Sequence, residues 1–500
     1  MTGGLISLAL SGYKDLYLID NPEITFFKKV YKQTSNFYIE SIIQNFKQEF
    51  EFNKKLCCNI SKIGDLLIDT YVYIKISNIN EYIDPLTNLT NKFVKFAWAK
   101  KLGFAIINKA EIEIGGNIIE TIYGDWLNIW YELTESNMKK NIDNMIGNIP
   151  EVYSFSDKKD GIELYIPLYF WFKNSNLALP LIAIKYHDIN INVVINNKEN
   201  ICNIGPNRSI EIDEDIIYLE SYELIEQTID NNKNLGLFLN FDIDNKVINY
   251  IQLSNEFILP NTNTDTKILS NYNIIGLTSK FTITPKKMTL TSNNNDIIPK
   301  ILSYDYSINV EKINLITTYV YLDTNEKLFF EKTSHTYLVN LTQYSNSTSF
   351  INKNLIFKLN FFNSCKELIW LCKLKYIKLL DIYNYTDNLV DNPNFLISHS
   401  NLYINDINVF NHNKSKFFNY IIPLYYHSNI PSIGINCYNF CLSTEDIQPT
   451  GSLNLSKINN ITLALDFNKL INEEIEILIF NLSYNFIKIQ NGLCSLLYIN

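Results

Sequence analysis

Histidines are the first residues to consider as metal ligands or general bases. The five histidines of the chain are His187, His335, His399, His412 and His427, and each lies in a separate segment. No two of them have the HxxxH or HExxH spacing that places two zinc-binding imidazoles on one face of a helix. We therefore predict no metal site and expect these imidazoles to be packed or on the surface.

Two short motifs near residue 113 could also carry chemistry. Glu111 and Glu113 alternate along one segment, and such a pair acts as acid and base only where a pocket raises one pKa. The sequence indicates no such pocket, so we expect both on a solvated strand face. Gly115 and Gly116 lack the GxGxxG and GxxxxGK[ST] patterns of phosphate loops, and we predict that they form a tight hairpin turn.

Clustered aromatic residues could form a platform for stacking sugars or bases. The candidates are Trp126, Trp130, Phe170, Trp171 and Phe172. Aromatic side chains also dominate cores and subunit interfaces, and we favour that interpretation. We therefore predict no catalytic, cofactor-binding or metal-binding residues and no cofactor, and the chain is predicted not to be an enzyme.

The eight cysteines do not form a zinc-binding or disulfide framework. Cys57 and Cys58 are adjacent, Cys437 and Cys441 are four apart, and no paired CxxC set occurs. We expect reduced, packed thiols, because disulfides are rare in reducing compartments.

Composition indicates a large globular β protein. The 500 residues exceed what one hydrophobic core usually holds, so two cores are expected. Hydrophobic residues make up 46% of the chain, and the 33 Tyr and 30 Phe favour half-buried strands. The net charge is −9 and no dense Lys and Arg cluster occurs, which argues against direct nucleic-acid binding.

Targeting signals are not apparent at the N-terminus. The opening MTGGLISLALSGYKDLYL has no basic leader, and no run of 18 apolar residues occurs in the sequence. Thr2 departs from the N-myristoylation pattern. We expect a protein that is neither secreted by the usual route nor membrane-spanning.

Many short alternating segments predict strands. DTYVYIKISNI from Asp69 has the period of a half-buried strand, EIEIGGNIIET from Glu111 predicts a hairpin, and residues 165–194 predict strands with bends at the prolines. DWLNIWYELT from Asp125 predicts one short amphipathic helix. YIIPLYYHSNIPSIGI from Tyr420 echoes YIPLYFWF from Tyr165, which hints at a duplication. Short strands separated by turn residues are typical of sandwiches and jelly rolls.

The chain resembles the double jelly-roll major capsid proteins of nucleocytoplasmic large DNA viruses, such as the irido-, phyco- and mimivirus relatives. Residues 3–42 resemble the family's N-terminal signature around NPEITFFK, at residues 21–28. Further ordered similarities begin at Leu102, Leu164, Tyr319 and Thr444 and continue to the C-terminus. Two features depart from the family pattern. Family members usually have a short connection where this chain has residues from about 198 to 312, and the basic residues that usually follow YLDT are fewer here.

The resemblance implies an all-β fold of two consecutive eight-stranded jelly rolls, with a few short helices and a long insertion. It implies an N-terminal arm at residues 1–24, a first roll at 25–330 that includes the insertion at about 198–312, and a second roll at 331–500. It further implies a homotrimeric capsomer of pseudo-hexagonal outline in an icosahedral shell. The partners would be neighbouring capsomers, minor capsid proteins and an internal membrane, after synthesis in the host cytoplasm or a viral factory.

Two alternatives remain open at this point. One is a double jelly-roll scaffold or minor capsid paralogue, which would be scarce in mature particles. The other is a glycan-binding or host-binding β-sandwich, with or without enzymatic activity, that uses the 198–312 insertion as its recognition surface.

Overall fold

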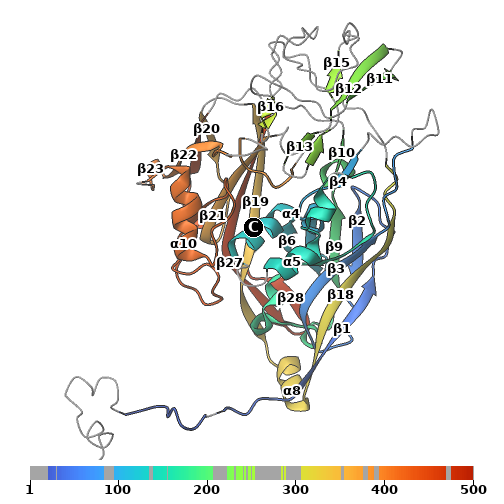
Figure 1. The fold of residues 1–500 in the computed structure, drawn as a ribbon. Coiled ribbons are helices and arrows are strands. Elements are labelled where there is room, and N and C mark those ends of the chain that lie inside the picture. Colours follow the sequence, from blue (N-terminus) through green and yellow to red (C-terminus); the bar gives the residue numbers. More distant parts are fainter. Residues whose placement is uncertain are drawn as a thin grey trace, which may run out of the picture.

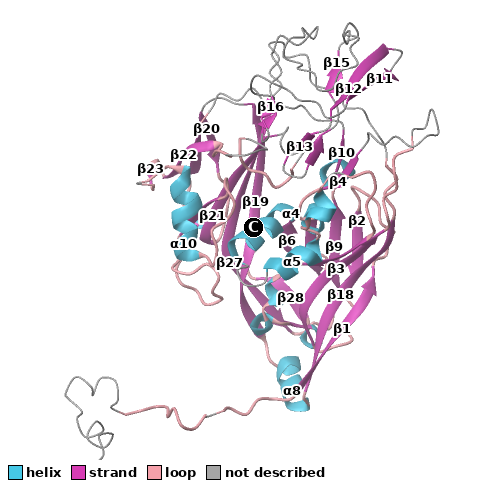
Figure 2. Cartoon of the chain, in the orientation of Figure 1, coloured by secondary structure: helices cyan, strands magenta, loops and turns pink. Residues whose placement is uncertain are grey.

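Two β-sandwiches lie side by side, with short helices between them and on the flank of one (Figure 1). The computed structural model describes 21–29, 31–83, 95–134, 139–154, 156–205, 306–350, 354–374, 381–387, 393–410, 412–468 and 474–498, together with the backbone of seven short strands between 222 and 288. Strands dominate the described chain and helices are few and short (Figure 2). We call the sandwich built before residue 323 the first roll and the one built after it the second roll.

The first roll consists of two antiparallel sheets. One sheet has the order β1-β18-β3-β7, with β8 paired to β3, and the other has the order β2-β9-β5-β6. The strands are β1 (Phe37–Asn45), β2 (Lys55–Asn59), β3 (Leu66–Ile76), β5 (Ile107–Ile114), β6 (Asn117–Tyr123), β7 (Ile162–Pro167), β8 (Leu179–Pro180), β9 (Ile189–Ile195) and β18 (Val310–Leu322).

The second roll has the same arrangement. Its sheets have the orders β19-β27-β21-β24, with β25 and β28 attached, and β20-β26-β22-β23. The strands are β19 (His335–Phe350), β20 (Asn354–Lys358), β21 (Ser364–Leu374), β22 (Ile397–Ile404), β23 (Ile407–Asn408), β24 (Asn436–Asn439), β25 (Leu453–Asn454), β26 (Ile461–Phe467), β27 (Glu474–Gln490) and β28 (Leu493–Leu496). In both rolls the eight principal strands enter the two sheets in the same succession along the chain, which is the jelly-roll topology.

Alternation of side chains explains why these segments form sheets. In β3, Val72 and Ile74 are fully buried and Ile76 nearly so, while the intervening Tyr71 and Tyr73 are half-buried on the other face. Successive residues of a strand point to opposite faces, so one face reaches the core and the other does not. The strand predicted from Asp69 is thereby confirmed.

The predicted hairpin is also confirmed. Ile114 pairs with Asn117, so Gly115 and Gly116 form a two-residue turn between β5 and β6. Their φ angles are 59° and 83°, which is the left-handed region that a type I′ turn requires at both positions. A Cβ on Gly115 would lie 2.6 Å from the ring of His187, so that position also lacks room for a side chain.

Short helices join the strands. They are α3 (Leu102–Ile106), α4 (Gly124–Thr134), α5 (Lys139–Ile146), α6 (Pro150–Tyr153), α7 (Lys198–Ile201), α8 (Thr324–Lys332) and α10 (Ile422–Tyr426). The 3-10 turns are η1 (Trp171–Lys173), η2 (Ser175–Leu177), η3 (Leu181–Ala183) and η6 (Leu455–Lys457), and the π-helical segment η5 (Phe417–Ile421) runs directly into α10. The helix predicted from Asp125 is confirmed as α4.

The two segments that echo each other in sequence have different structures. YIPLYFWF from Tyr165 ends strand β7 and enters η1, whereas YIIPLYYH from Tyr420 forms the end of η5 and α10. Pro423 lies at the start of α10, directly after the π-helical turn η5. The echo therefore does not mark equivalent positions, and the repetition in the chain is one of strand order.

The predicted insertion at about 198–312 falls mostly outside the described residues. Its described strands are β10 (Cys202–Gly205), β11 (Tyr222–Ile229), β12 (Asn232–Leu239), β13 (Phe241–Ile243), β14 (Lys246–Ile248), β15 (Ile251–Leu253), β16 (Ile283–Thr284) and β17 (Lys287–Met288). β10 pairs with β4 (Lys95–Trp98), and the Tyr306 ring lies 5.1 Å from that of Phe96 in β4. Both described ends of the stretch therefore meet at β4.

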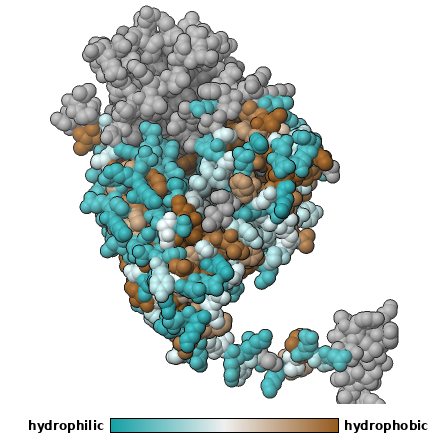
Figure 3. All heavy atoms as spheres, turned by 180° about the vertical axis from the view of Figure 1, so that it is seen from behind, coloured by the Kyte–Doolittle hydropathy of each residue, from teal (hydrophilic) through white to brown (hydrophobic). Residues whose placement is uncertain are grey.

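The predicted N-terminal arm lies outside the described residues up to residue 20. From Asn21 to β1 the chain extends away from the body (Figure 1). The side chains of Phe26 and Phe27 are 92% and 98% exposed, and no described helix occurs in this segment. Seen from behind, the body is largely hydrophilic with scattered hydrophobic patches (Figure 3).

The interior is mostly apolar, with a smaller set of buried polar and charged side chains. One continuous hydrophobic cluster includes residues of both rolls, among them Trp126, Phe170, Trp171 and Phe172. The prediction of aromatic core packing is confirmed for these four. All eight cysteines are free thiols, and seven of them are buried. No helix in the described part of the chain is both long and apolar enough to cross a bilayer.

Candidate functional site at the seam between the two rolls

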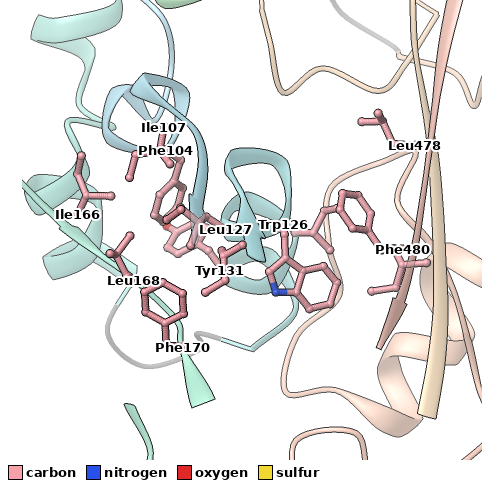
Figure 4. Packing of buried hydrophobic residues seen from close by; sticks show 14 of the residues in the cluster. Phe104, Ile107, Trp126, Leu127, Tyr131, Ile166, Leu168, Phe170, Leu478 and Phe480 are labelled. Carbon is pink, nitrogen blue, oxygen red and sulfur yellow. The ribbon is translucent and has the colours of Figure 1, made fainter. Parts of the chain in front are cut away.

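Helix α4 is the element that joins the two rolls. Leu127 and Tyr131 point into the core of the first roll, while Trp126 on the other side points toward Phe480 of β27 in the second roll (Figure 4). The ring centroids of Trp126 and Phe480 are 5.5 Å apart, and Trp126 stacks on Trp130 one turn later. A helix with apolar residues on two sides is suited to lie between two bodies. We call the contact between α4 and the second roll the seam.

The seam covers the outer face of the sheet β19-β27-β21. Tyr344 pairs with Phe480 in the ladder, and Tyr123 at the end of β6 lies 4.3 Å from Tyr344. Lys373 of β21, which is 1% exposed, forms an ion pair with Asp125 in the first turn of α4. Removing one partner of a buried ion pair leaves an uncompensated charge, so this pair makes separation of the rolls costly.

A chain of polar contacts continues along α4. Lys101 donates to the side-chain oxygen of Asn128 at 2.6 Å and forms an ion pair with Glu132. Asn128, which is fully buried, donates from its amide to the Tyr385 hydroxyl of the second roll at 2.9 Å. The Glu132 carboxylate accepts from the backbone N–H of Ser432 at 3.2 Å. The rolls are therefore joined by the buried hydrogen bond between Asn128 and Tyr385 and by the exposed one between Ser432 and Glu132, as well as by apolar packing.

A buried charge cluster closes the far end of the seam. His427, directly after α10, lies 2.8 Å from the Glu367 carboxylate and 3.6 Å from that of Glu445, and its ring meets the edge of Trp130. Burial alone would lower the pKa of His427, but the two carboxylates outweigh it and raise the pKa from 6.5 to about 9. The imidazole therefore stays protonated at neutral pH and balances the buried charge of Glu367.

Close backbone approach fixes the start of α4. A Cβ on Gly124 would lie 2.1 Å from the Ile107 carbonyl oxygen, so no other residue fits there without a backbone shift. A polar pocket of about 250 Å³ opens beside this point, between Asp125, Lys373, Tyr344 and residues of β5 and α7. Of its charged side chains, Asp125 and Lys373 form an ion pair, and Glu476 accepts a hydrogen bond from the Asn346 side chain.

The structure corrects the prediction for Glu111. Its side chain is buried rather than solvated, and it forms ion pairs with Lys109 and, at 3.6 Å, with Lys55. Glu113 is half-buried and accepts from the Asn192 side chain at 3.1 Å. The two carboxylates are thus engaged in the sheet. Lys109 on the same strand and Lys55 on β2, two strands away, supply the positive charge that makes burial of Glu111 possible.

Sequence reasoning also missed a buried acid in the first roll. Glu120 of β6 is 6% exposed and accepts one hydrogen bond, from the backbone N–H of Trp171 at 3.2 Å. Burial raises the pKa of the Glu120 carboxyl from 4.5 to about 8. The alternation of β6 would have placed Glu120 on a core face. Nothing in the sequence showed that no cation would lie beside its carboxylate.

The histidines are dispersed in space as in sequence. His187 accepts from the Cys494 N–H through Nδ1, His335 contacts the Phe330 carbonyl oxygen, and His399 contacts Ser398. Among the described residues, no group of three His, Cys, Asp or Glu side chains is placed to hold a metal ion.

Comparison with known proteins assigns the family. Residues 25–231 match the model for the major capsid protein N-terminus, and residues 326–495 match the model for the large eukaryotic DNA virus major capsid protein. Probable capsid protein 4 of Acanthamoeba polyphaga mimivirus is 33% identical over 98% of both chains. The chain belongs to the major capsid proteins of large eukaryotic DNA viruses.

Solved structures of viral capsid proteins share the fold of this major capsid protein. The Faustovirus major capsid protein superposes with a TM-score of 0.66 at 11% identity, covering 96% of this chain and 94% of that one. PBCV-1 VP54 superposes with a TM-score of 0.63 at 18% identity, covering 95% and 100%. The predicted double jelly-roll fold is therefore confirmed, and the chain belongs to a structural family rather than to an enzyme family.

Proposed function

We propose that this capsid protein assembles as a homotrimer of pseudo-hexagonal outline that tiles an icosahedral shell. The observation that supports it most is the repetition of one strand order in two rolls that stand side by side. Three copies would place six similar rolls in a ring, and a ring of similar units packs with near-sixfold symmetry. Closed rings of this kind arise when one head-to-tail contact repeats and its rotation closes.

The seam supports the same proposal. Because α4 locks the two rolls through Trp126, Asp125 and Asn128, each chain would enter the shell as one rigid unit of two rolls. The proposal includes the division into an arm at 1–24, a first roll at 25–330 and a second roll at 331–500. It includes no catalytic, cofactor-binding or metal-binding residue.

The proposed partners are neighbouring capsomers and, on the inner face of the shell, minor capsid proteins and an internal membrane. The exposed segment before β1, with Phe26, Phe27 and Tyr31 uncovered, is available for such contacts. The acidic net charge of −9 argues against direct binding of the genome. Synthesis in the host cytoplasm or a viral factory, followed by incorporation into virions, completes the proposal.

Electron microscopy of the purified full-length protein tests the proposal. We expect pseudo-hexagonal particles with a threefold centre in negative stain, together with a trimer mass in solution. A protein that stays monomeric at micromolar concentration and is missing from purified virions would overturn it. Copy number in mature particles separates a shell protein, at hundreds to thousands of copies, from a scaffold, which would be nearly absent.

A further inference from the structure

The second roll carries a helix in the same place along the chain as α4. In each roll the first helix after the β5–β6 or β22–β23 hairpin precedes the next strand of the larger sheet, and these helices are α4 and the continuous segment η5–α10. Both helices pack one side into the core of their own roll. In η5–α10 that side is formed by Phe418, which is fully buried against Trp370, and by Ile422.

The other side of η5–α10 is apolar and uncovered. Tyr420, Ile421, Leu424 and Tyr425 are 36%, 41%, 61% and 75% exposed and follow the spacing of one helix face. No charged residue occurs between 417 and 426. The corresponding side of α4 bears Trp126 and Trp130 and lies against the second roll. We call the exposed side of η5–α10 the open helix face.

The first roll has an uncovered sheet that matches the sheet covered by α4. In the ladder of β1-β18-β3-β7, Ile43 pairs with Ile316, Ile316 with Tyr71, and Tyr73 with Tyr165. These five side chains share the outer face; Ile43 is 59% and Tyr165 37% exposed, and the other three are half-buried. Tyr73 and Tyr165 have ring centroids 5.0 Å apart. We call this surface the open sheet face.

The positions of the two helices show why the open helix face and the open sheet face can be two sides of one contact. α4 lies between the rolls, and α10 lies on the flank of the second roll (Figure 1). Each chain therefore contains one completed contact, the seam, and the two unmatched halves of a second contact of the same kind. A heterologous contact repeated in this way joins copies head to tail, and it closes into a ring of three when each contact rotates the next copy by one third of a turn.

We propose that the open helix face of one copy packs on the open sheet face of a second copy, repeating between chains the contact that α4 makes within the chain. This rests on the proposed trimer and names the surface that holds it together. Apolar side chains with aromatic residues on both sides, and no charge on the helix, fit the core of a permanent interface. The ion pair of Lys75 and Glu311 lies at the edge of the open sheet face and would form part of the polar rim.

Substitution of the helix face tests the proposal with a matched control. Leu424→Asp introduces a charge on the open helix face, and Ile356→Asp introduces the same charge at a 72% exposed position on the other sheet of the second roll. Both side chains are exposed, so the monomers should fold with unchanged melting temperature. We expect Leu424→Asp to raise the concentration at which trimers dissociate by at least tenfold, and Ile356→Asp to leave it unchanged.

Cross-linking identifies the partner surface directly. Leu424→Cys and Ile43→Cys, each in a Cys57→Ser background because the other native cysteines are buried, are mixed and treated with a short bismaleimide. We expect linked dimers in the mixture and none with either variant alone. Trimers that persist in Leu424→Asp and give no cross-link would overturn this docking and leave the trimer standing. A wild-type protein without trimers would overturn both.

Discussion

The two jelly rolls have the same strand order, but among the described residues only the second has its larger sheet covered on the outside. Helix α4 closes over Tyr344, Phe480 and Lys373 of the second roll, whereas Ile43 and Tyr165 of the first roll face solvent. A chain with two similar rolls thus has one larger sheet that is covered by a helix of the other roll and one larger sheet that is uncovered. Such asymmetry is what a head-to-tail assembly requires, because the missing cover must come from another molecule.

The connections diverge more than the sheets. Between the last two principal strands the second roll has residues 468–473, while the first roll has residues 196–309. The hairpin turns use different residues for the same backbone, Gly115 and Gly116 in the first roll and Asn405 and Asp406 in the second, all with positive φ. Loops tolerate such change because they carry few core contacts, whereas strand order is tied to the packed interior.

The largest effect on the contact between the two rolls should come from a substitution that removes the apolar part of the seam. We expect Trp126→Ala to lower the free energy of unfolding by about 4 kcal/mol, because it empties the space between α4 and Phe480. Thermal unfolding followed by tryptophan fluorescence and calorimetry measures it. The first roll should also become separable by limited proteolysis; a single unchanged transition would contradict the role of Trp126.

Removing the charge that faces Lys373 should be the next largest change. Asp125→Ala leaves a buried ammonium without its carboxylate, and we expect a loss of about 3 kcal/mol in unfolding free energy. Chemical denaturation measures the loss. The double variant Asp125→Ala with Lys373→Met is the control, and it should recover part of the stability; a double variant less stable than Asp125→Ala would argue against the ion pair.

The first roll should lose stability at a lower pH than the second, because of Glu120. Burial raises the pKa of Glu120 from 4.5 to about 8, so the folded protein favours the neutral carboxyl. The free energy of unfolding is therefore highest below pH 4.5 and falls as the pH rises through 8, because a charged carboxylate must then be buried. Glu120→Gln cannot ionise and is expected to be more stable than wild type by on the order of 2 kcal/mol at pH 8. Melting temperatures from pH 5 to 8 test this; parallel curves for the two proteins would contradict it.

The second roll should respond to pH through His427. Its pKa is raised from 6.5 to about 9, so its stabilising charge is fully present below pH 6.5 and is lost as pH rises through 9. We expect wild type to lose on the order of 1 kcal/mol between pH 7 and 9.5, and His427→Gln to lack this fall. The comparison is made in the Glu120→Gln background so that Glu120 does not contribute to the pH dependence.

The smallest loss of stability is expected at the hairpin turn of the first roll, and it tests whether the two hairpin turns have the same backbone requirement. Gly116 has a φ of 83° and open space around it, so Gly116→Ala should cost about 1 kcal/mol through backbone strain alone. Gly116→Asn should cost less, because Asn tolerates positive φ, as Asn405 does in the second roll. Equal melting temperatures for the Ala and Asn variants would show that the turn backbone is not the determinant.

Local patterns predicted local structure well in this chain. The alternation from Asp69, the Gly115 and Gly116 turn and the helical spacing from Trp126 each depend on neighbours in sequence, and the structure confirms all three. The family resemblance, rather than composition, supplied the double jelly roll. The remaining features depend on residues that are distant in sequence.

The seam could not be predicted for that reason. Asp125 and Lys373 meet only when two rolls pack together, and nothing near either residue in sequence indicates the other. The buried state of Glu111 depends on Lys109 and on Lys55, which lies two strands away in the sheet and more than fifty residues away in sequence. The helical segment η5–α10 is anchored to its roll by Asn419, whose amide donates to the carbonyl oxygens of Ser432 and Ile435.

The meeting of both ends of the 206–305 stretch at β4 makes this position a natural acceptor for foreign sequence. Phe96 of β4 pairs with Ile204 on one side and contacts the Tyr306 ring on the other, and Lys198 donates to the Tyr306 carbonyl oxygen at 2.6 Å. Two chain ends held this close can be joined by a few residues or by a folded cargo with adjacent termini, because the entropy of closing a loop grows only slowly with its length. A shell built from such subunits would display many copies of that cargo without any change to the sheets beneath it.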